Sequence, residues 1–142
     1  MKIVDVNLLI YAYNNADPLH GRACRWLTAA FNGPERIGIA LSTALAYVRI
    51  TTNVRIFPQP LSVADACTVV QEWLACDNVV LLAPTERHWE LFRQLAIAAQ
   101  ARGPLAPDAD LAASAIEHGA TLCTHDRDYS RFEGVRIEFP LS

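Results

Sequence analysis

Short runs of apolar residues alternate with longer amphipathic segments along the whole chain. The apolar runs cover residues 3–4, 37–41, 79–82 and 120–124, and residues 135–139 form a candidate edge strand. Short apolar runs of this kind are typical of buried strands. The segments between them place apolar residues at helical spacing, with capping residues such as Ser62 and stop residues such as Gly119 at their ends. They predict helices over residues 7–13, 18–32, 42–53, 62–74, 85–102 and 107–118.

The alternation of strands with helices predicts an α/β fold. Buried parallel strands need helices on both faces, so we expect a three-layer α/β/α sandwich around a mostly parallel sheet of four to five strands. The chain of 142 residues shows no repeat, low-complexity segment or linker. Residues 1–142 are therefore predicted to form a single domain, long enough to bury a substantial core.

Composition narrows the class of protein. Hydrophobic residues make up 52% of the chain and charged residues 19%, which excludes a disordered chain. No apolar run reaches the roughly 18 residues that a membrane span needs, and Asp5 comes too early for a secretory signal. The four cysteines lack the paired spacing of a zinc site and each falls in an apolar stretch, so we expect buried thiols and a cytoplasmic protein.

The net charge of the whole chain argues against a nucleic-acid-binding protein. Twelve basic residues face 15 acidic ones, for a formal charge of −3, whereas nucleic-acid-binding domains are usually basic. That conclusion holds only if the acidic residues are spread evenly. The position of the carboxylates along the chain therefore decides the partner class.

Four aspartates lie at or near the predicted carboxyl ends of strands, where α/β proteins usually have their binding sites. Asp5 ends the first strand, Asp126 and Asp128 follow the fourth, and Asp108 opens a helix after a Gly-Pro-rich loop. Ligands of open α/β sheets bind outside the carboxyl ends of the strands. If the first and fourth strands are neighbours, these carboxylates converge.

Each aspartate also has a simpler interpretation. Asp108 would compensate a helix dipole, and Asp126 or Asp128 would serve as a turn or cap residue. Asp5 is harder to explain in this way, because a carboxylate at the end of a buried strand loses solvation and no basic residue lies near it in sequence after Lys2. Converging carboxylates favour the binding of a shared hard cation such as Mg²⁺ or Mn²⁺. A cation held in this way can catalyse phosphodiester hydrolysis.

Three segments match a known family. Residues 3–9, 107–113 and 117–132 resemble the PIN-domain ribonucleases, and specifically the VapC-type toxins of bacterial toxin–antitoxin pairs. The third segment is the most specific, and with the chain length the resemblance covers nearly the whole sequence.

The resemblance implies an endoribonuclease that cuts single-stranded or loop RNA with Mg²⁺ or Mn²⁺. It also implies that a cognate antitoxin inhibits the protein and that the protein forms a homodimer. The implied site residues are the metal ligands Asp5, Asp108 and Asp126, the nearby acid Asp128, and the supporting polar residues Asn7 and Thr124.

One expected residue is absent. The family usually carries a Glu in the helix after the second strand, but no acid lies between Glu35 and Asp65, and Ala46 is its closest counterpart. Asp110 is a tempting substitute, although on a regular helix it points about 200° away from Asp108. The alternative to an active nuclease is therefore a PIN-fold module that binds RNA or antitoxin with weak or lost hydrolysis. A phosphotransfer domain with Asp5 as acceptor is disfavoured, because no suitable Lys follows a later strand.

Arginine accounts for eleven of the twelve basic residues. Its guanidinium grips phosphate bidentately, and Arg49, Arg127 and Arg131 are the candidates for RNA contacts. For each of them a solvated or carboxylate-paired side chain is the alternative. Without Asp5, Asp108, Asp126 and Asp128, the 12 basic residues face 11 acidic ones. The remaining surface is close to neutral, which permits RNA binding.

Overall fold

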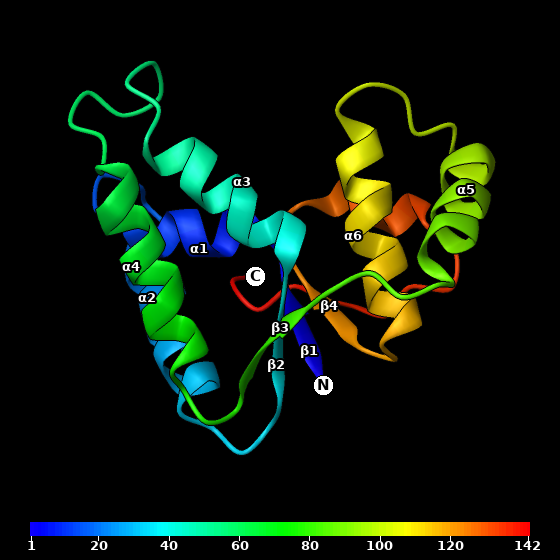
Figure 1. Ribbon diagram of the computed structural model, residues 1–142, viewed down its shortest axis with the longest axis horizontal. Coiled ribbons are helices and arrows are strands. Elements are labelled where there is room, and N and C mark those ends of the chain that lie inside the picture. Colours follow the sequence, from blue (N-terminus) through cyan, green and yellow to red (C-terminus); the bar gives the residue numbers. More distant parts are fainter.

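Five short parallel strands form the centre of the molecule (Figure 1). The computed structural model describes all residues 1–142. The strands are β1 (Lys2–Val4), β2 (Ile37–Ala40), β3 (Val79–Leu82), β4 (Thr121–Cys123) and β5 (Ile137–Glu138), in the spatial order β3-β2-β1-β4-β5. Every pairing is parallel, so the predicted parallel sheet is confirmed with five strands.

Helices cover both faces of this sheet. One face carries α1 (Val6–Tyr13), α2 (His20–Phe31), α3 (Leu41–Thr51) and α4 (Val63–Leu74), and the other carries α5 (His88–Ala99) and α6 (Leu105–Glu117). Figure 1 shows the two groups on opposite sides of the strands. A short 3₁₀ helix, η1 (Arg127–Arg131), follows β4. The three-layer prediction is confirmed.

The core divides along the sheet because side chains alternate across a strand. Ile3 packs into the cluster beneath α5 and α6, whereas its neighbour Val4 packs into the cluster formed with α1 to α4. Both side chains are fully buried. The expectation of buried thiols is confirmed for Cys123 and is wrong for Cys67, which is exposed on α4 because its position falls on the outer face of that helix. None of the helices combines the length and the apolar character that crossing a membrane would require.

Three helices begin two or three residues away from the start that the sequence predicts, and α2 is the first of them, with its start at His20 instead of residue 18. α6 starts at Leu105, with Pro107 inside its first turn. Proline is tolerated there because the first N–H groups of a helix have no acceptor within it. α5 starts at His88 instead of Thr85, because the Thr85 hydroxyl and backbone N–H are engaged by Glu117 of α6.

The strand order places the predicted site residues together. β1 lies between β2 and β4, with Val4 opposite Cys123. Asp5 and Thr124, the next residues along the two strands, therefore emerge side by side. α3 follows β2 directly, so its first turn lies at the same edge of the sheet.

Candidate active site

A cleft of about 380 Å³ opens at the carboxyl edge of the sheet. α3 contributes Ser42, Thr43, Ala46 and Arg49 to its lining, α6 contributes Pro107, Asp108, Asp110 and Leu111, and Asp5, Val6, Pro104 and Tyr129 complete it. The cleft thus combines residues from the first strand end, the second crossover and the last third of the chain.

Asp5 lies at the base of this cleft and is 7% exposed. Its backbone N–H donates to the carbonyl of Cys123, and the Thr124 hydroxyl donates to its Oδ2 at 2.7 Å. Burial raises the pKa of Asp5 to about 6, against hydrogen bonds from Thr124 and Val6 that lower it, and the charges of Asp108 and Asp126 raise it further. Such a carboxylate is costly to ionise unless a cation comes to it.

Asp108 occupies the first turn of α6 on the same cleft. The Tyr129 hydroxyl donates to its Oδ1 at 3.2 Å. Burial raises the pKa of Asp108; the Tyr129 bond and the charge of Arg131 lower it, while Asp126 and Asp128 raise it. The charge of Asp126 acts on both Asp5 and Asp108, so these three carboxylates from distant parts of the chain lie near enough to influence one another.

Asp126 and Asp128 lie in the turn after β4. Asp126 caps η1 by accepting the N–H of Asp128 at 2.8 Å, and its own N–H donates to the Thr124 hydroxyl. Asp128 is exposed and pairs with Arg131 at 3.7 Å. Asp126 thus serves as a cap and also adds negative charge to the site, so the two interpretations of this residue are compatible.

The donor set fits a hard divalent cation that keeps part of its water shell. No three His, Cys, Asp or Glu side chains lie close enough to enclose a metal by themselves. Mg²⁺ in proteins is usually held by only one or two carboxylates with waters and substrate phosphate. In addition, Asn7 donates to Thr124 while its buried Oδ1 has no hydrogen-bond partner. An unsatisfied oxygen on the residue that donates to Thr124 suits a hard cation or one of its bound waters as a partner.

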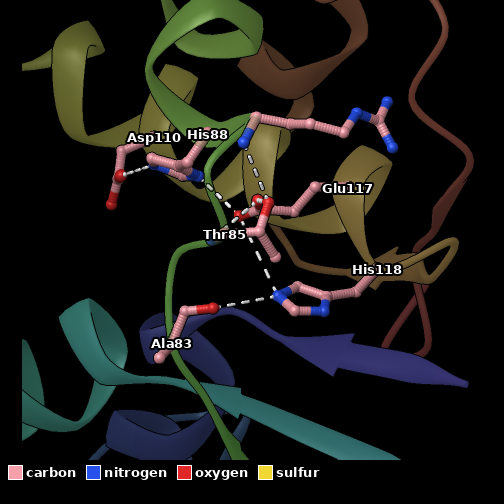
Figure 2. A network of polar contacts seen from close by, with 7 residues as sticks. Ala83, Thr85, His88, Asp110, Glu117 and His118 are labelled. Atoms are coloured by element: carbon pink, nitrogen blue, oxygen red, sulfur yellow. Dashed lines mark hydrogen bonds and ion pairs between the residues drawn. The ribbon is translucent and has the colours of Figure 1, made fainter.

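Asp110 points to a different partner. α6 is a regular helix, and His88 of α5 binds Asp110 Oδ1 through Nε2 at 2.6 Å and Glu117 Oε1 through Nδ1 at 2.6 Å (Figure 2). Thr85 donates to the other oxygen of Glu117, whose side chain is fully covered. Asp110 therefore lines the cleft while its Oδ1 is held by His88.

Both ring nitrogens of His88 face carboxylates, so the imidazole is held in its charged form. Burial alone would lower the pKa of His88, but the hydrogen bonds to Asp110 and Glu117 outweigh it, and the pKa is raised. Burial likewise raises the pKa of Glu117, but its bonds to Thr85 and His88 outweigh this effect and lower it. The network ties α5 to α6 as a charged bridge.

Removal of His88 is expected to destabilise the protein. A His88→Ala substitution leaves the covered Glu117 carboxylate without its cation, for a loss of about 3 kcal/mol in the free energy of unfolding. Because the folded pKa is raised, this contribution is present in full below about pH 6.5 and declines as the pH rises through the folded value. Urea unfolding at about pH 6 and about pH 9 measures it. His20→Ala on α2 is the control, since that ring contacts the Tyr11 carbonyl at 2.9 Å and pairs with no carboxylate; equal losses in both variants would contradict the bridge.

The three arginine candidates lie in different surroundings. Arg49 of α3 lines the cleft and forms no ion pair. Arg131 pairs with Asp128, near Asp108. Arg127 stacks on Phe139 at 3.9 Å and donates to Ser142, so its guanidinium is engaged by the C-terminal segment. Of the three, Arg49 is the best placed to meet a phosphate in the cleft.

Two contributors were not foreseen from the sequence. Tyr129 carries a signal only in retrospect, as the aromatic residue that follows Asp128 in the motif 117–132. His88 carries none, because its partners lie 22 and 29 residues away. Ala46, the counterpart of the Glu that the family usually carries, does line the cleft.

Comparisons with known proteins show the family to which the chain belongs. Residues 2–135 match the PIN domain family. Ribonuclease VapC37 of Mycobacterium tuberculosis is 43% identical over 99% of this chain and 97% of its own length, and ribonuclease VapC43 of the same organism is 39% identical over 99% and 96%.

Solved structures show the same fold. VapC20 of Mycobacterium tuberculosis, described as a sarcin–ricin loop cleaving toxin, superposes with a TM-score of 0.69 at 18% identity, over 96% of this chain and 99% of that one. VapBC2 of Rickettsia felis, bound to promoter DNA, gives 0.70 at 14% identity over 96% of both chains. The chain belongs to the PIN-domain family and, within it, to the VapC-type ribonucleases.

Proposed function

We propose that this protein is a divalent-metal-dependent endoribonuclease, the toxin of a toxin–antitoxin pair, which hydrolyses phosphodiester bonds in single-stranded or loop RNA. The observation that carries the proposal is the cleft shared by Asp5 and Asp108, with the charge of Asp126 acting on both. Its relatives of full length at 37–43% identity are named as ribonucleases.

Asp5, Asp108 and Asp126 would hold Mg²⁺ or Mn²⁺, with Asp128 nearby. When bound, the metal supplies a water of lowered pKa and offsets the charge that develops on the phosphate. Thr124 holds Asp5 through Oδ2, and Tyr129 holds Asp108 through Oδ1, so both carboxylates keep fixed positions. Asn7 supports Thr124 from α1.

The substrate would enter between α3 and α6. Arg49 lies on the α3 wall of the cleft, where its guanidinium would bind a backbone phosphate and hold the RNA over the acids. Arg131 and Arg127 lie farther out, each with a partner of its own. We further propose a cognate antitoxin as the protein partner, a homodimer, and a cytoplasmic site of action. One solved structure of the same fold is a toxin–antitoxin complex from Klebsiella pneumoniae.

A PIN-fold binding module without hydrolysis is the second candidate. It is favoured by Ala46, which leaves the cleft one carboxylate short of the family pattern. The two candidates differ in whether RNA is cut when a metal is supplied.

Cleavage of RNA by the purified protein tests the proposal. We expect cuts with Mg²⁺ or Mn²⁺, none with EDTA, and a loss of about a hundredfold in rate for Asp108→Asn. Asp77→Asn, an exposed aspartate before β3, is the matched control and should keep the wild-type rate. Equal cleavage by wild type and Asp108→Asn would point to a contaminating nuclease. Metal-dependent RNA binding without any cut would favour the binding module.

A further inference from the structure

A second hollow continues the acid cleft along α3. It measures about 180 Å³ and lies between the start of α3, the end of β3 and α6. The side chains that matter are apolar Leu41, Leu45 and Leu82 and polar Ser42, Asp110 and Ser114. Ser42 and Asp110 also line the acid cleft, so the two hollows adjoin at these residues.

The α3 wall of this hollow is apolar and open to solvent. Leu41 is 43% exposed and Leu45 is 62% exposed. Large aliphatic side chains left open beside a polar cleft are suited to the flat face of a heterocycle, as in pockets that hold a base between apolar side chains.

The α6 wall supplies a fixed hydrogen-bond acceptor. His88 binds Asp110 Oδ1 at 2.6 Å, and Asp110 Oδ2 makes no hydrogen bond within the protein. An ionised carboxylate only accepts hydrogen bonds. The charged His88 also offsets part of the negative charge of Asp110, so a polyanion can approach this wall.

We propose that this hollow is a nucleobase subsite for a nucleotide next to the scissile phosphate, in which Asp110 accepts a hydrogen bond from an exocyclic amino group. The inference rests on the proposed RNA substrate and adds a specificity to it. Cytosine, adenine and guanine carry such an amino group and uracil does not. The only base donor of uracil is its N3–H, which lies between two carbonyl oxygens that a carboxylate repels, so the subsite favours the amino-bearing bases over uracil. His88 acts as a positioning residue for Asp110.

A base fits this hollow better than a phosphate does. Asp110 would repel a phosphate, and the leucine side chains offer it no donor, whereas Arg49 in the adjoining cleft does. The two adjoining hollows thus differ in what they suit, a phosphate beside Arg49 and a base beside Leu45.

Binding without metal tests the subsite apart from cleavage. Fluorescence anisotropy in EDTA compares oligocytidine and oligouridine of about ten nucleotides, two pyrimidines that differ at the amino group. We expect wild type to bind oligocytidine about tenfold more tightly, and Asp110→Asn, which replaces an acceptor by a donor, to lose this preference.

Two further variants keep the test independent of Asp110. Leu45→Ala should weaken binding of both oligonucleotides severalfold without changing their ratio, because Leu45 would contact the face of the base. Val63→Ala, of matched exposure (63% against 62%) on α4, should bind both as wild type does. Equal binding of the two oligonucleotides by wild type, binding of neither, or a preference that survives Asp110→Asn would overturn the subsite.

The outcome is separable from that of the nuclease assay. Metal-dependent cleavage with no cytidine preference would leave the proposed function standing and refute the subsite. A cytidine preference without any cleavage would support the subsite and refute the proposed nuclease function. In the cleavage assay itself, sequencing the ends of a cut random RNA library should show one position beside the cut at which uridine is depleted in wild type and restored in Asp110→Asn.

Discussion

Asp5→Asn is expected to abolish metal-dependent cleavage and at the same time to make the folded protein more stable at neutral pH. The loss of activity follows from removing a buried carboxylate at the base of the cleft. The gain in stability follows from burial, since an ionised Asp5 is held among Asp108 and Asp126 without a cation. The asparagine carbonyl can still accept the Thr124 hydroxyl, so the local structure is preserved.

The size and pH dependence of this gain follow from the pKa of Asp5. It is about 6 in the folded protein against 3.8 ordinarily, which corresponds to up to about 3 kcal/mol. Below about pH 4 both the folded and the unfolded chain hold the proton, so the penalty is absent. As the pH rises from there to about 6, the folded chain binds more protons than the unfolded one and stability falls. Above that range the penalty is complete.

Urea unfolding in EDTA at about pH 4 and about pH 7 measures the effect. We expect wild type and Asp5→Asn to differ little at the lower pH and most at the higher one. Saturating Mn²⁺ should then raise the stability of wild type and leave the variant unchanged, since only a folded state that binds the ligand gains from it. Asp77→Asn, at an exposed position, serves as control. A variant that is less stable than wild type at pH 7 would refute the assignment of Asp5 as a strained metal ligand.

Ala46→Glu is expected to tighten divalent-metal binding by about tenfold or more and to raise cleavage at limiting metal concentration. Ala46 lies on the α3 wall of the cleft that Asp5 and Asp108 share. A third carboxylate there would add a hard ligand, and the number of charged ligands is a main determinant of affinity for such cations. Without metal the same carboxylate adds repulsion, so the variant should be less stable in EDTA.

Calorimetric titration with Mn²⁺, together with cleavage rates across a metal series, measures this prediction. Ala46→Gln is the matched control, because it has the same size without the charge and should not tighten binding. If Ala46→Glu and Ala46→Gln behave alike, the absent carboxylate is not what limits metal affinity. If wild type does not cleave RNA and Ala46→Glu does, the absent carboxylate at position 46 is the reason why wild type only binds RNA.

The two predictions share a physical basis in the distribution of charge. The formal charge of −3 seemed to speak against RNA, but the fold concentrates Asp5, Asp108 and Asp126 at one edge of the sheet. The mutual repulsion of these carboxylates favours the binding of a cation, and Arg49 lies on the α3 wall of the same cleft. The net charge therefore reflects a metal site more than the nature of the partner.

Local sequence was sufficient for the fold class and for the acids that end strands. Apolar runs and helical spacing reflect burial that each element needs wherever it packs, so the strands, the helices and the positions of Asp5 and Asp126 could be predicted from the sequence. Helix starts were less certain. α6 begins before Pro107, which lies in its first turn. α5 begins after Thr85, which donates two hydrogen bonds to Glu117, a residue 32 positions further along the chain.

The sequence by itself thus determined the parallel α/β architecture and the acidic character of its carboxyl edge. Only the tertiary structure decided which carboxylates have partners. Asp110 and Asp108 lie two residues apart, yet His88 of α5 holds one and Tyr129 of η1 holds the other. Those contacts join residues 21 and 22 positions apart. They depend on how α5, α6 and η1 pack over the sheet, and no local pattern encodes that packing.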